Sequence, residues 1–274
     1  MVTTNMPLYT TLHLHNVPAG READYAKWFD GTHRAAVSKL RGFKEAERYE
    51  VTAEQIMVDI AQPWRFMSVY DFDCTDPAKD LPPLGALIAE SRKAGLIDDA
   101  GENERVYSYR MYSDWKASPN WKRDQPLSGI SLILANYVAG RFAEYQDWYD
   151  NVHSGEVINV PGHVSMKRGE LASTQLEPRR YCPGDQVVLC GQQTDDLMFT
   201  IKDFSARAGG RSRSGIAMQA RSKAASFART VHYFKKISGT QFWKGGIAYA
   251  GDLSVYPGKN APHPKPQPPS GGRG

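Results

Sequence analysis

The chain has 274 residues, of which 41% are hydrophobic and 11% aromatic; this content supports a folded core and excludes a chain that is disordered throughout. A net charge of +4 is too small to indicate a protein that binds nucleic acid. Three cysteines, Cys74, Cys182 and Cys190, match no metal-binding spacing and favour a reduced, cytoplasmic location. We expect no secretion signal and no membrane span, because no apolar stretch approaches about 18 residues.

The first half of the chain predicts an alternation of strands and helices. Leu12 and Leu14 alternate with polar residues, as in a strand with two different faces. An amphipathic helix follows, and Gly42 stands where a helix commonly ends. In chain order the predicted elements are strand 8–16, helix 22–40, strand 43–51, strand 64–72, helix 84–94 and strand 105–112.

The second half repeats the first at an offset of 120 residues. Residues 19–48 and 139–168 align without a gap, and the tryptophan and histidine of the helix are identical in both. The identical pairs are Ala19/Ala139, Gly20/Gly140, Arg21/Arg141, Ala23/Ala143, Tyr25/Tyr145, Trp28/Trp148, Asp30/Asp150, His33/His153, Val37/Val157, Gly42/Gly162 and Arg48/Arg168. A repeat of this length indicates two copies of a whole domain.

The remaining elements of the second half follow from the same pattern. We expect strands at 128–136, 163–171, 186–193 and 230–237, and a second helix within 215–228. The predicted organisation is a first domain at 1–115, a linker at 116–127, a second domain at 128–238 and a Pro/Gly-rich extension at 239–274. Residues 202–229 are rich in lysine and arginine, which indicates a solvated surface or a clamp for an anion. Nucleic acid is a third alternative, but no run of aromatic residues that could stack on bases accompanies them.

Each half thus reads as an α+β unit with the order β-α-β-β-α-β, the ferredoxin-like unit. With Trp-(Phe/Tyr)-Asp-x-x-His on the first helix and a glycine nine residues later, the sequence resembles the dimeric α/β-barrel superfamily, and within it the EthD-like proteins. The resemblance implies two sheets that close a barrel, here within one chain, and a homodimer or higher homo-oligomer. We expect Leu12 and Leu14 to face the helices, and Thr11, His13 and His15 to face the lumen. Because Ile133 and Ala135 replace the two histidines, we expect the first half to carry the more polar cavity.

The repeated helix motif carries the candidate catalytic residues. These are His33 and His153, chosen because an ordinary imidazole titrates near neutral pH, as general acid–base catalysis requires. Asp30 and Asp150 precede them by three residues and so share a helix face, from which a carboxylate could orient the imidazole. The alternative is structural, since the same motif could fasten the helix to the next strand in both halves.

Five further residues are candidates for binding a substrate. His13 and His15 share one strand face, where they could bind a substrate oxygen or, with His33 or Asp59, a divalent metal. Arg110 could bind an anionic group, and Tyr112 could donate a proton. Trp28 lies on the apolar helix stripe, which is typical of core, and remains a candidate ligand contact.

The resemblance implies an enzyme of small-molecule metabolism. We predict a lyase, of the dehydratase or decarboxylase type, that acts without a cofactor or metal on a small aromatic or polyketide-like metabolite. The alternatives are an oxygenase, either cofactor-free or haem-dependent, and a non-catalytic protein that binds a small molecule. We expect a small aromatic molecule as the partner, and neither nucleic acid nor membrane. No nucleotide-binding glycine loop and no serine-hydrolase motif is present in the sequence.

Overall fold

The strands form one closed antiparallel barrel in the computed structural model, which describes residues 7–57, 60, 62–178, 182–211, 217–226 and 230–237. The strands are β1 (Leu8–His15), β2 (Phe43–Val51), β3 (Phe66–Asp73), β4 (Glu104–Met111), β5 (Lys116–Ala117), β6 (Gly129–Ala135), β7 (His163–Leu171), β8 (Gln186–Gln192) and β9 (Thr230–Lys236). Their order is β4-β1-β3-β2-β9-β6-β8-β7, and β7 pairs with β4 to close the ring. The short β5 lies at the start of the predicted linker and pairs with β7.

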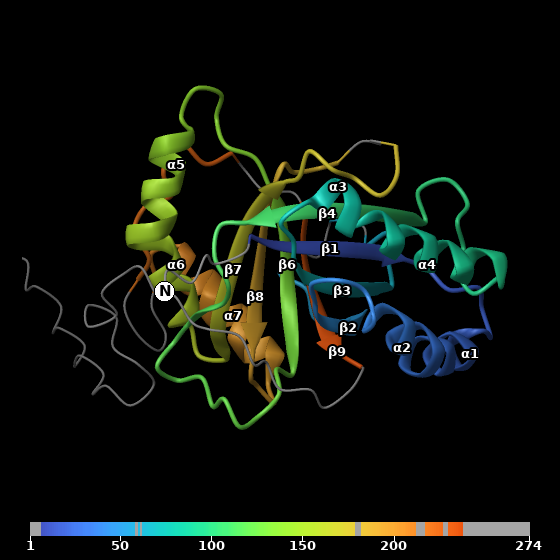
Figure 1. Cartoon of the computed structure of the whole chain (residues 1–274). Helices are drawn as coiled ribbons and strands as arrows, with labels where there is room; N and C mark the ends of the chain where they lie inside the picture. Colours follow the sequence, from blue (N-terminus) through green and yellow to red (C-terminus); the bar gives the residue numbers. More distant parts are fainter. Residues whose placement is uncertain are drawn as a thin grey trace, which may run out of the picture.

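The two halves repeat one order of elements. The helices of the first half are α1 (Glu22–Lys27), η1 (Trp28–His33), α2 (Arg34–Val37), α3 (Pro77–Asp80) and α4 (Pro82–Lys93). Those of the second half are α5 (Phe142–Trp148), η2 (Tyr149–His153), α6 (Ser154–Ile158) and α7 (Leu197–Ala208). The helices of the two halves lie on opposite sides of the barrel (Figure 1). The order β4-β1-β3-β2 of the first half recurs in the second as β9-β6-β8-β7, so the halves are related by an approximate twofold axis.

The halves join at two short seams. Three residue pairs join β2 to β9, and three join β4 to β7. Within a half the strands pair over longer stretches, such as the eight pairs between β1 and β3. Neither half keeps a free edge at the seams, because each supplies the outer strands that the other pairs with.

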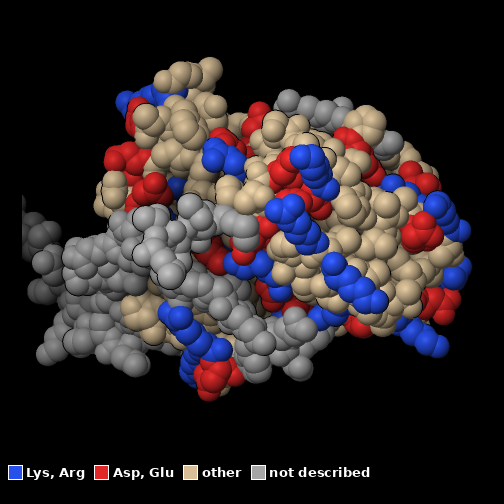
Figure 2. All heavy atoms as spheres, in the orientation of Figure 1, with Lys and Arg blue, Asp and Glu red and all other residues tan. Residues whose placement is uncertain are grey.

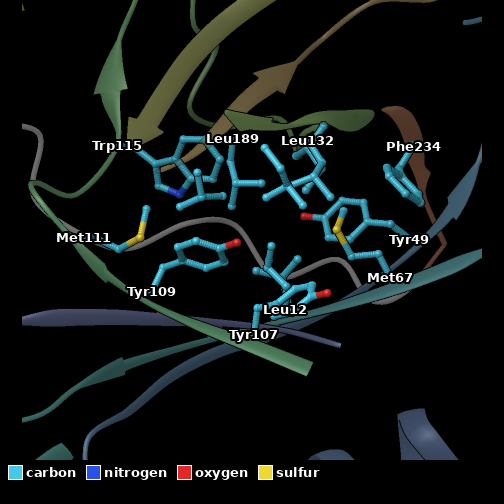
Figure 3. Close-up of a cluster of buried hydrophobic side chains, with 14 of the residues drawn as sticks. Leu12, Tyr49, Met67, Tyr107, Tyr109, Met111, Trp115, Leu132, Leu189 and Phe234 are labelled. Carbon is cyan, nitrogen blue, oxygen red and sulfur yellow. The ribbon is translucent and has the colours of Figure 1, made fainter. Parts of the chain in front are cut away.

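The barrel interior is apolar and holds side chains from both halves. Leu12, Tyr49 and Met67 of the first half meet Leu132, Leu189 and Phe234 of the second (Figure 3). The expected faces of β1 are therefore wrong, since Leu12 and Leu14 point into the barrel while His15 contacts Tyr25 on α1. The physical reason is that apolar side chains of both halves fill the closed barrel, whereas on the helix-covered face His13 pairs with Glu104, which also accepts from Arg92 of α4.

One end of the interior carries charged residues. Nζ of Lys167 lies 2.5 Å from Oδ2 of Asp71, and the lysine side chain is 1% exposed. The hydroxyl of Thr10 donates to the other carboxylate oxygen of Asp71 at 2.6 Å, and the lysine ammonium lies 4.8 Å from the centre of the Trp115 ring. Glu45 faces Asp71 across β2 and β3, and burial together with the charge of Asp71 raises the pKa of Glu45 to about 7.

The second helix of the second half lies earlier in the chain than expected. It is α7, at Leu197–Ala208, and the described residues 217–226 of the predicted 215–228 helix are not helical. The side chain of Asp196 caps α7 by accepting from the backbone N–H of Phe199 at 2.8 Å, a start signal that the sequence offers. The additional residues of the second half therefore follow α7. This shifts β9 to a larger offset than the other strands have.

Charges of both signs alternate over the described surface in Figure 2, without a broad region of one sign on that face. In the basic segment, Arg207 is buried and pairs with Asp203 at 2.7 Å. Residues 212–216 and 227–229 of this segment, and the predicted extension at 239–274, lie outside the described residues. Among the described helices, none has both the length and the apolar character needed to cross a membrane.

Candidate functional site

The repeated helix motif forms a π-helical turn in both halves. η1 ends at His33 and η2 ends at His153. Hydrogen bonds in a π-helix run from residue i to i+5, which places residues five apart over one another. The ring of His33 accordingly stacks on Trp28 at 4.4 Å, and the ring of His153 stacks on Trp148 at 4.2 Å. The tryptophan and the histidine of each stacked pair are identical in the two halves of the sequence.

The two motif aspartates contact arginines on the following strands. Oδ2 of Asp30 accepts from Arg48 at 2.7 Å, and Oδ1 of Asp150 accepts from Arg168 at 2.7 Å. Asp150 also accepts from Lys116 at 3.0 Å. Neither aspartate is hydrogen-bonded to its motif histidine, because the π-turn changes which residues share a face. These contacts fasten each π-turn to its strand, as the structural alternative for the motif expects.

In the first half, the space between sheet and helices is filled by hydrogen-bonded polar side chains. Nε2 of His33 lies 2.9 Å from the hydroxyl of Tyr70, and the hydroxyl of Tyr25 lies 3.1 Å from Ser68. Nε2 of His13 lies 2.7 Å from Glu104, and the rings of His13 and His15 are 4.3 Å apart. Every one of these side chains is buried. The first half therefore brings His13, His15 and His33 together, in a packed cluster.

Burial makes this cluster sensitive to acid. It lowers the pKa of His33 to about 3, with help from the charge of His13, while an unfolded histidine titrates near 6.5. The unfolded chain therefore binds more protons below pH 6.5, and stability falls with the pH. Glu104 adds to the acid sensitivity at lower pH: burial raises its pKa, but hydrogen bonds from His13 and Arg92 outweigh burial and lower it to about 2. Its contribution to stability is therefore lost as the pH falls from its unfolded value, near 4.5, toward 2.

We expect the stability of His33→Gln to depend less on pH than that of the wild type. Between pH 7.5 and pH 5, His33 should contribute about 2 kcal/mol of the wild-type loss in unfolding free energy. Urea denaturation of both proteins at the two pH values measures the difference. Equal losses in the two proteins would contradict a neutral, buried His33.

Smaller side chains open a cavity at the same place in the second half. Ile133 and Ala135 stand where the first half has His13 and His15, and Cys190 stands where it has Tyr70. The cavity has a volume of about 450 Å³ and lies between the sheet and the helices of the second half. Its wall is mostly apolar and includes a group of aromatic side chains among aliphatic ones, namely Tyr145, Trp148, Tyr149, Phe204 and Tyr233. The expectation of a more polar cavity in the first half is therefore wrong, because larger rings of the first half occupy the equivalent space.

His153 lies in the wall of this cavity and is held by a buried carboxylate. Its Nδ1 is 3.4 Å from Oε2 of Glu156, and its side chain is 19% exposed. The other oxygen of Glu156 accepts from the backbone N–H of Gln219 at 2.6 Å, which fixes the carboxylate. No described residue bonds to Nε2 of His153, since Cys190 replaces the tyrosine that pairs with His33. The arrangement leaves an oriented imidazole nitrogen for a ligand.

Sequence reasoning missed several polar groups of the cavity. Glu156 acts in the place that we expected Asp150 to take, and His163 at the start of β7 has no counterpart in the first half, where Phe43 stands. Tyr145 and Tyr149 also line the cavity, and burial raises the pKa of both phenols, so that they remain protonated at neutral pH. A comparison of the two aligned halves could have found these residues, because the cavity lies where the two halves differ in side-chain size or polarity.

The other predicted binding residues lie away from this cavity. Arg110 is 52% exposed and pairs with Glu170 on β7, across the seam. Tyr112 donates to Gln186 at 2.8 Å, and Trp28 is half-buried against His33. Among the described residues, no three His, Cys, Asp or Glu side chains form a group suited to a metal ion. Asp59, which we considered as a metal ligand, lies outside the described residues.

A loop from the first half closes the cavity of the second. Ile56 and Met57, between β2 and β3, contribute to its wall. Gln55 fixes the loop: its side chain accepts from the backbone N–H of Tyr233 and donates to the carbonyl of Tyr233, both at 2.9 Å. Gln175 makes the same pair of bonds to Ser108 at the other seam. The cavity is thus completed across the two halves.

Substitution of this glutamine is expected to affect both stability and binding. Gln55→Ala leaves the backbone N–H of Tyr233 unpaired, while the Tyr233 carbonyl keeps its bond from the N–H of Thr52. The loss should lower the unfolding free energy by about 1–3 kcal/mol. It should also weaken ligand binding in the cavity, because Ile56 and Met57 lose their anchor. Gln175→Ala is the matched control, with a similar loss of stability and unchanged binding. Denaturation and calorimetric titration measure the two effects, and equal binding losses in both variants would contradict the role of the loop.

Comparison with known proteins supports the fold. No protein-family model matches the sequence, and none of the curated proteins matches it significantly. The structure is similar to that of a monooxygenase-like protein of Fusobacterium nucleatum subsp. nucleatum ATCC 25586, with 10% identity and a TM-score of 0.52 over 89% of this chain and 97% of that one. It is also similar to an anthrone oxidase-like protein, with 7% identity and a TM-score of 0.50 over 86% of this chain and 93% of that one. The chain therefore has an α/β-barrel fold.

Proposed function

We propose that the second-half cavity is the active site of an enzyme that abstracts a proton from a small aromatic or polyketide-like metabolite. The observation that carries the proposal is His153, whose Nδ1 faces a buried carboxylate while its Nε2 is left for a ligand. In this proposal His153 is the general base, Glu156 orients it, and the aromatic wall binds a flat ring by contact. His33, Asp30 and Asp150 then support the fold.

Two reactions can follow the abstraction of a proton. In a lyase, a carbanion next to a C–OH group expels hydroxide, which leaves as water with a proton supplied by the enzyme. Tyr145 and Tyr149 line the cavity and carry O–H groups from which that proton can come, which favours this route.

In an oxygenase, the carbanion of an activated CH₂ group reacts with O₂, and loss of water gives a ketone, so that R₂CH₂ and O₂ become R₂C=O and H₂O. The likeness to a monooxygenase-like and an anthrone oxidase-like protein favours this route. In both routes, the first step is proton abstraction, which needs only the histidine base.

We also propose that the two halves arose by tandem duplication of an EthD-like, ferredoxin-like unit, on the basis of the repeated Asp–Arg and Trp–His contacts.

Turnover under air and under argon distinguishes the routes. Purified protein is incubated with a panel of hydroxylated aromatic and polyketide-like acids and ketones, and oxygen uptake and product masses are recorded. Loss of water or CO₂ under both atmospheres identifies a lyase. A product that gains one oxygen and loses two hydrogens, only under air, identifies the oxygenase. Binding without turnover would indicate a binding protein, and a Soret band in the purified protein would indicate the haem-dependent alternative.

A further inference from the structure

His163 carries a buried ring nitrogen that has no hydrogen-bond partner among the residues that the structure describes. It is the first residue of β7, it is 2% exposed, and it lines the cavity. On another side it borders a surface cleft formed by the linker and the start of α7. No described residue is hydrogen-bonded to its Nε2. A buried acceptor without a partner is rare in proteins and costs about 1–3 kcal/mol, so its place in a ligand cavity needs a reason.

The surroundings of His163 determine the tautomer and the protonation state of its imidazole ring. Nδ1 lies 3.2 Å from the backbone carbonyl of Val157, which can only accept, so Nδ1 carries the hydrogen and Nε2 is an acceptor. The rings of Phe204 and Tyr233 pack against the imidazole, with centres 5.9 and 6.4 Å away. Burial lowers the pKa of His163 to about 4, so the ring is neutral at pH 7. The cavity thus presents one fixed acceptor in an aromatic wall.

The first half shows that the fold does not require a histidine here. Phe43 occupies the equivalent place at the start of β2, after a glycine that matches Gly162, and it packs in the core of its half. The polar ring of His163 therefore adds an acceptor where an apolar ring suffices for packing. Its neighbourhood differs from that of His153, which lies on η2 and faces Glu156.

We propose that Nε2 of His163 accepts a hydrogen bond from a hydroxyl group of the bound molecule, and that the substrate is consequently a hydroxyarene or an enolised polyketide. An aromatic hydrocarbon or an aryl ether of the same shape would leave this nitrogen unpaired and would bind more weakly. The inference rests on the proposed function in that it names the substrate class of the same cavity. The test of this inference measures binding rather than turnover, so the inference and the proposed function can fail independently of each other.

The test compares 1-naphthol with 1-methoxynaphthalene as probes, by calorimetric titration of the full chain. The wild type is expected to bind naphthol about tenfold more tightly, the value of one buried hydrogen bond. In His163→Phe, which introduces the residue of the first half, the two probes should bind within about twofold of each other. His163→Gln retains an acceptor and should recover part of the preference.

Three outcomes of this titration would contradict the proposed hydroxyl site at His163. Equal affinity of the two probes for the wild type, a preference that survives in His163→Phe, or no binding of either probe would overturn the assignment. His153→Gln should keep the naphthol preference. If that variant also keeps full turnover, the proposed catalytic role of His153 fails while the hydroxyl site stands.

Discussion

His153→Gln is expected to lower kcat/KM by about 10²- to 10⁴-fold, the usual effect of removing a general base. Glutamine has a similar size and keeps a polar group against Trp148, so the protein should remain folded. Binding of a substrate analogue should change much less than turnover, because the aromatic wall that holds the ring is intact. Steady-state kinetics with the substrate identified in the turnover screen, together with analogue titration, gives both quantities.

The chain contains its own control for this experiment. His33→Gln alters the same motif in the other half, where the histidine bonds to Tyr70 and no substrate is expected. It should lower stability and leave kcat/KM within about threefold of the wild type. If His33→Gln abolished turnover and His153→Gln did not, the site would belong to the first half and the proposal would be wrong.

Asp71→Asn should be the most destabilising of the substitutions considered. It removes the charge that faces the fully buried Lys167 and also weakens the bond from Thr10. Breaking a buried ion pair by removing one partner typically costs about 3–5 kcal/mol, because the remaining charge stays without compensation. Denaturant unfolding at pH 7 measures the loss.

Glu45 provides a check on this interpretation. Its pKa is raised to about 7 by burial and by Asp71, so in Asp71→Asn it should ionise more readily and partly replace the lost charge. Adding Glu45→Gln should therefore increase the loss of stability further. Glu170→Gln, which breaks the exposed pair with Arg110, is the surface control and should cost less than about 1 kcal/mol. A comparable loss in this control would contradict the importance of burial.

The sequence predicted the order of the elements well, because local patterns determine it. The alternation around Leu12, the stop at Gly42 and the repeat in register placed most strands close to where they lie, and the α+β class is confirmed. The helix of residues 197–208 was missed, because the repeated pattern of elements placed the second helix within 215–228, where the described residues are not helical. A local pattern could not reveal the π-turns, which changed the partners of Asp30 and His33.

The location of the cavity could not be predicted from one copy of the repeat. Which face of β1 points inward depends on closure of the barrel, a property of both halves together. The cavity depends on differences in side-chain volume, such as Cys190 against Tyr70 and Ala135 against His15, which require knowledge of that face. The aligned copies contained these differences, but polarity rather than volume guided the interpretation.

The short seams suggest how the barrel opens. Each half pairs its own strands over long stretches, whereas only three residue pairs join β2 to β9 and β4 to β7. Cooperative units of this kind open locally before the whole protein unfolds, and amide hydrogens report the order. Exchange should therefore be fastest at the seam residues near Val51 and Met111 and slowest in β1 and β8. Because the loop that closes the cavity begins at a seam, such opening also provides a route for ligands to enter and leave.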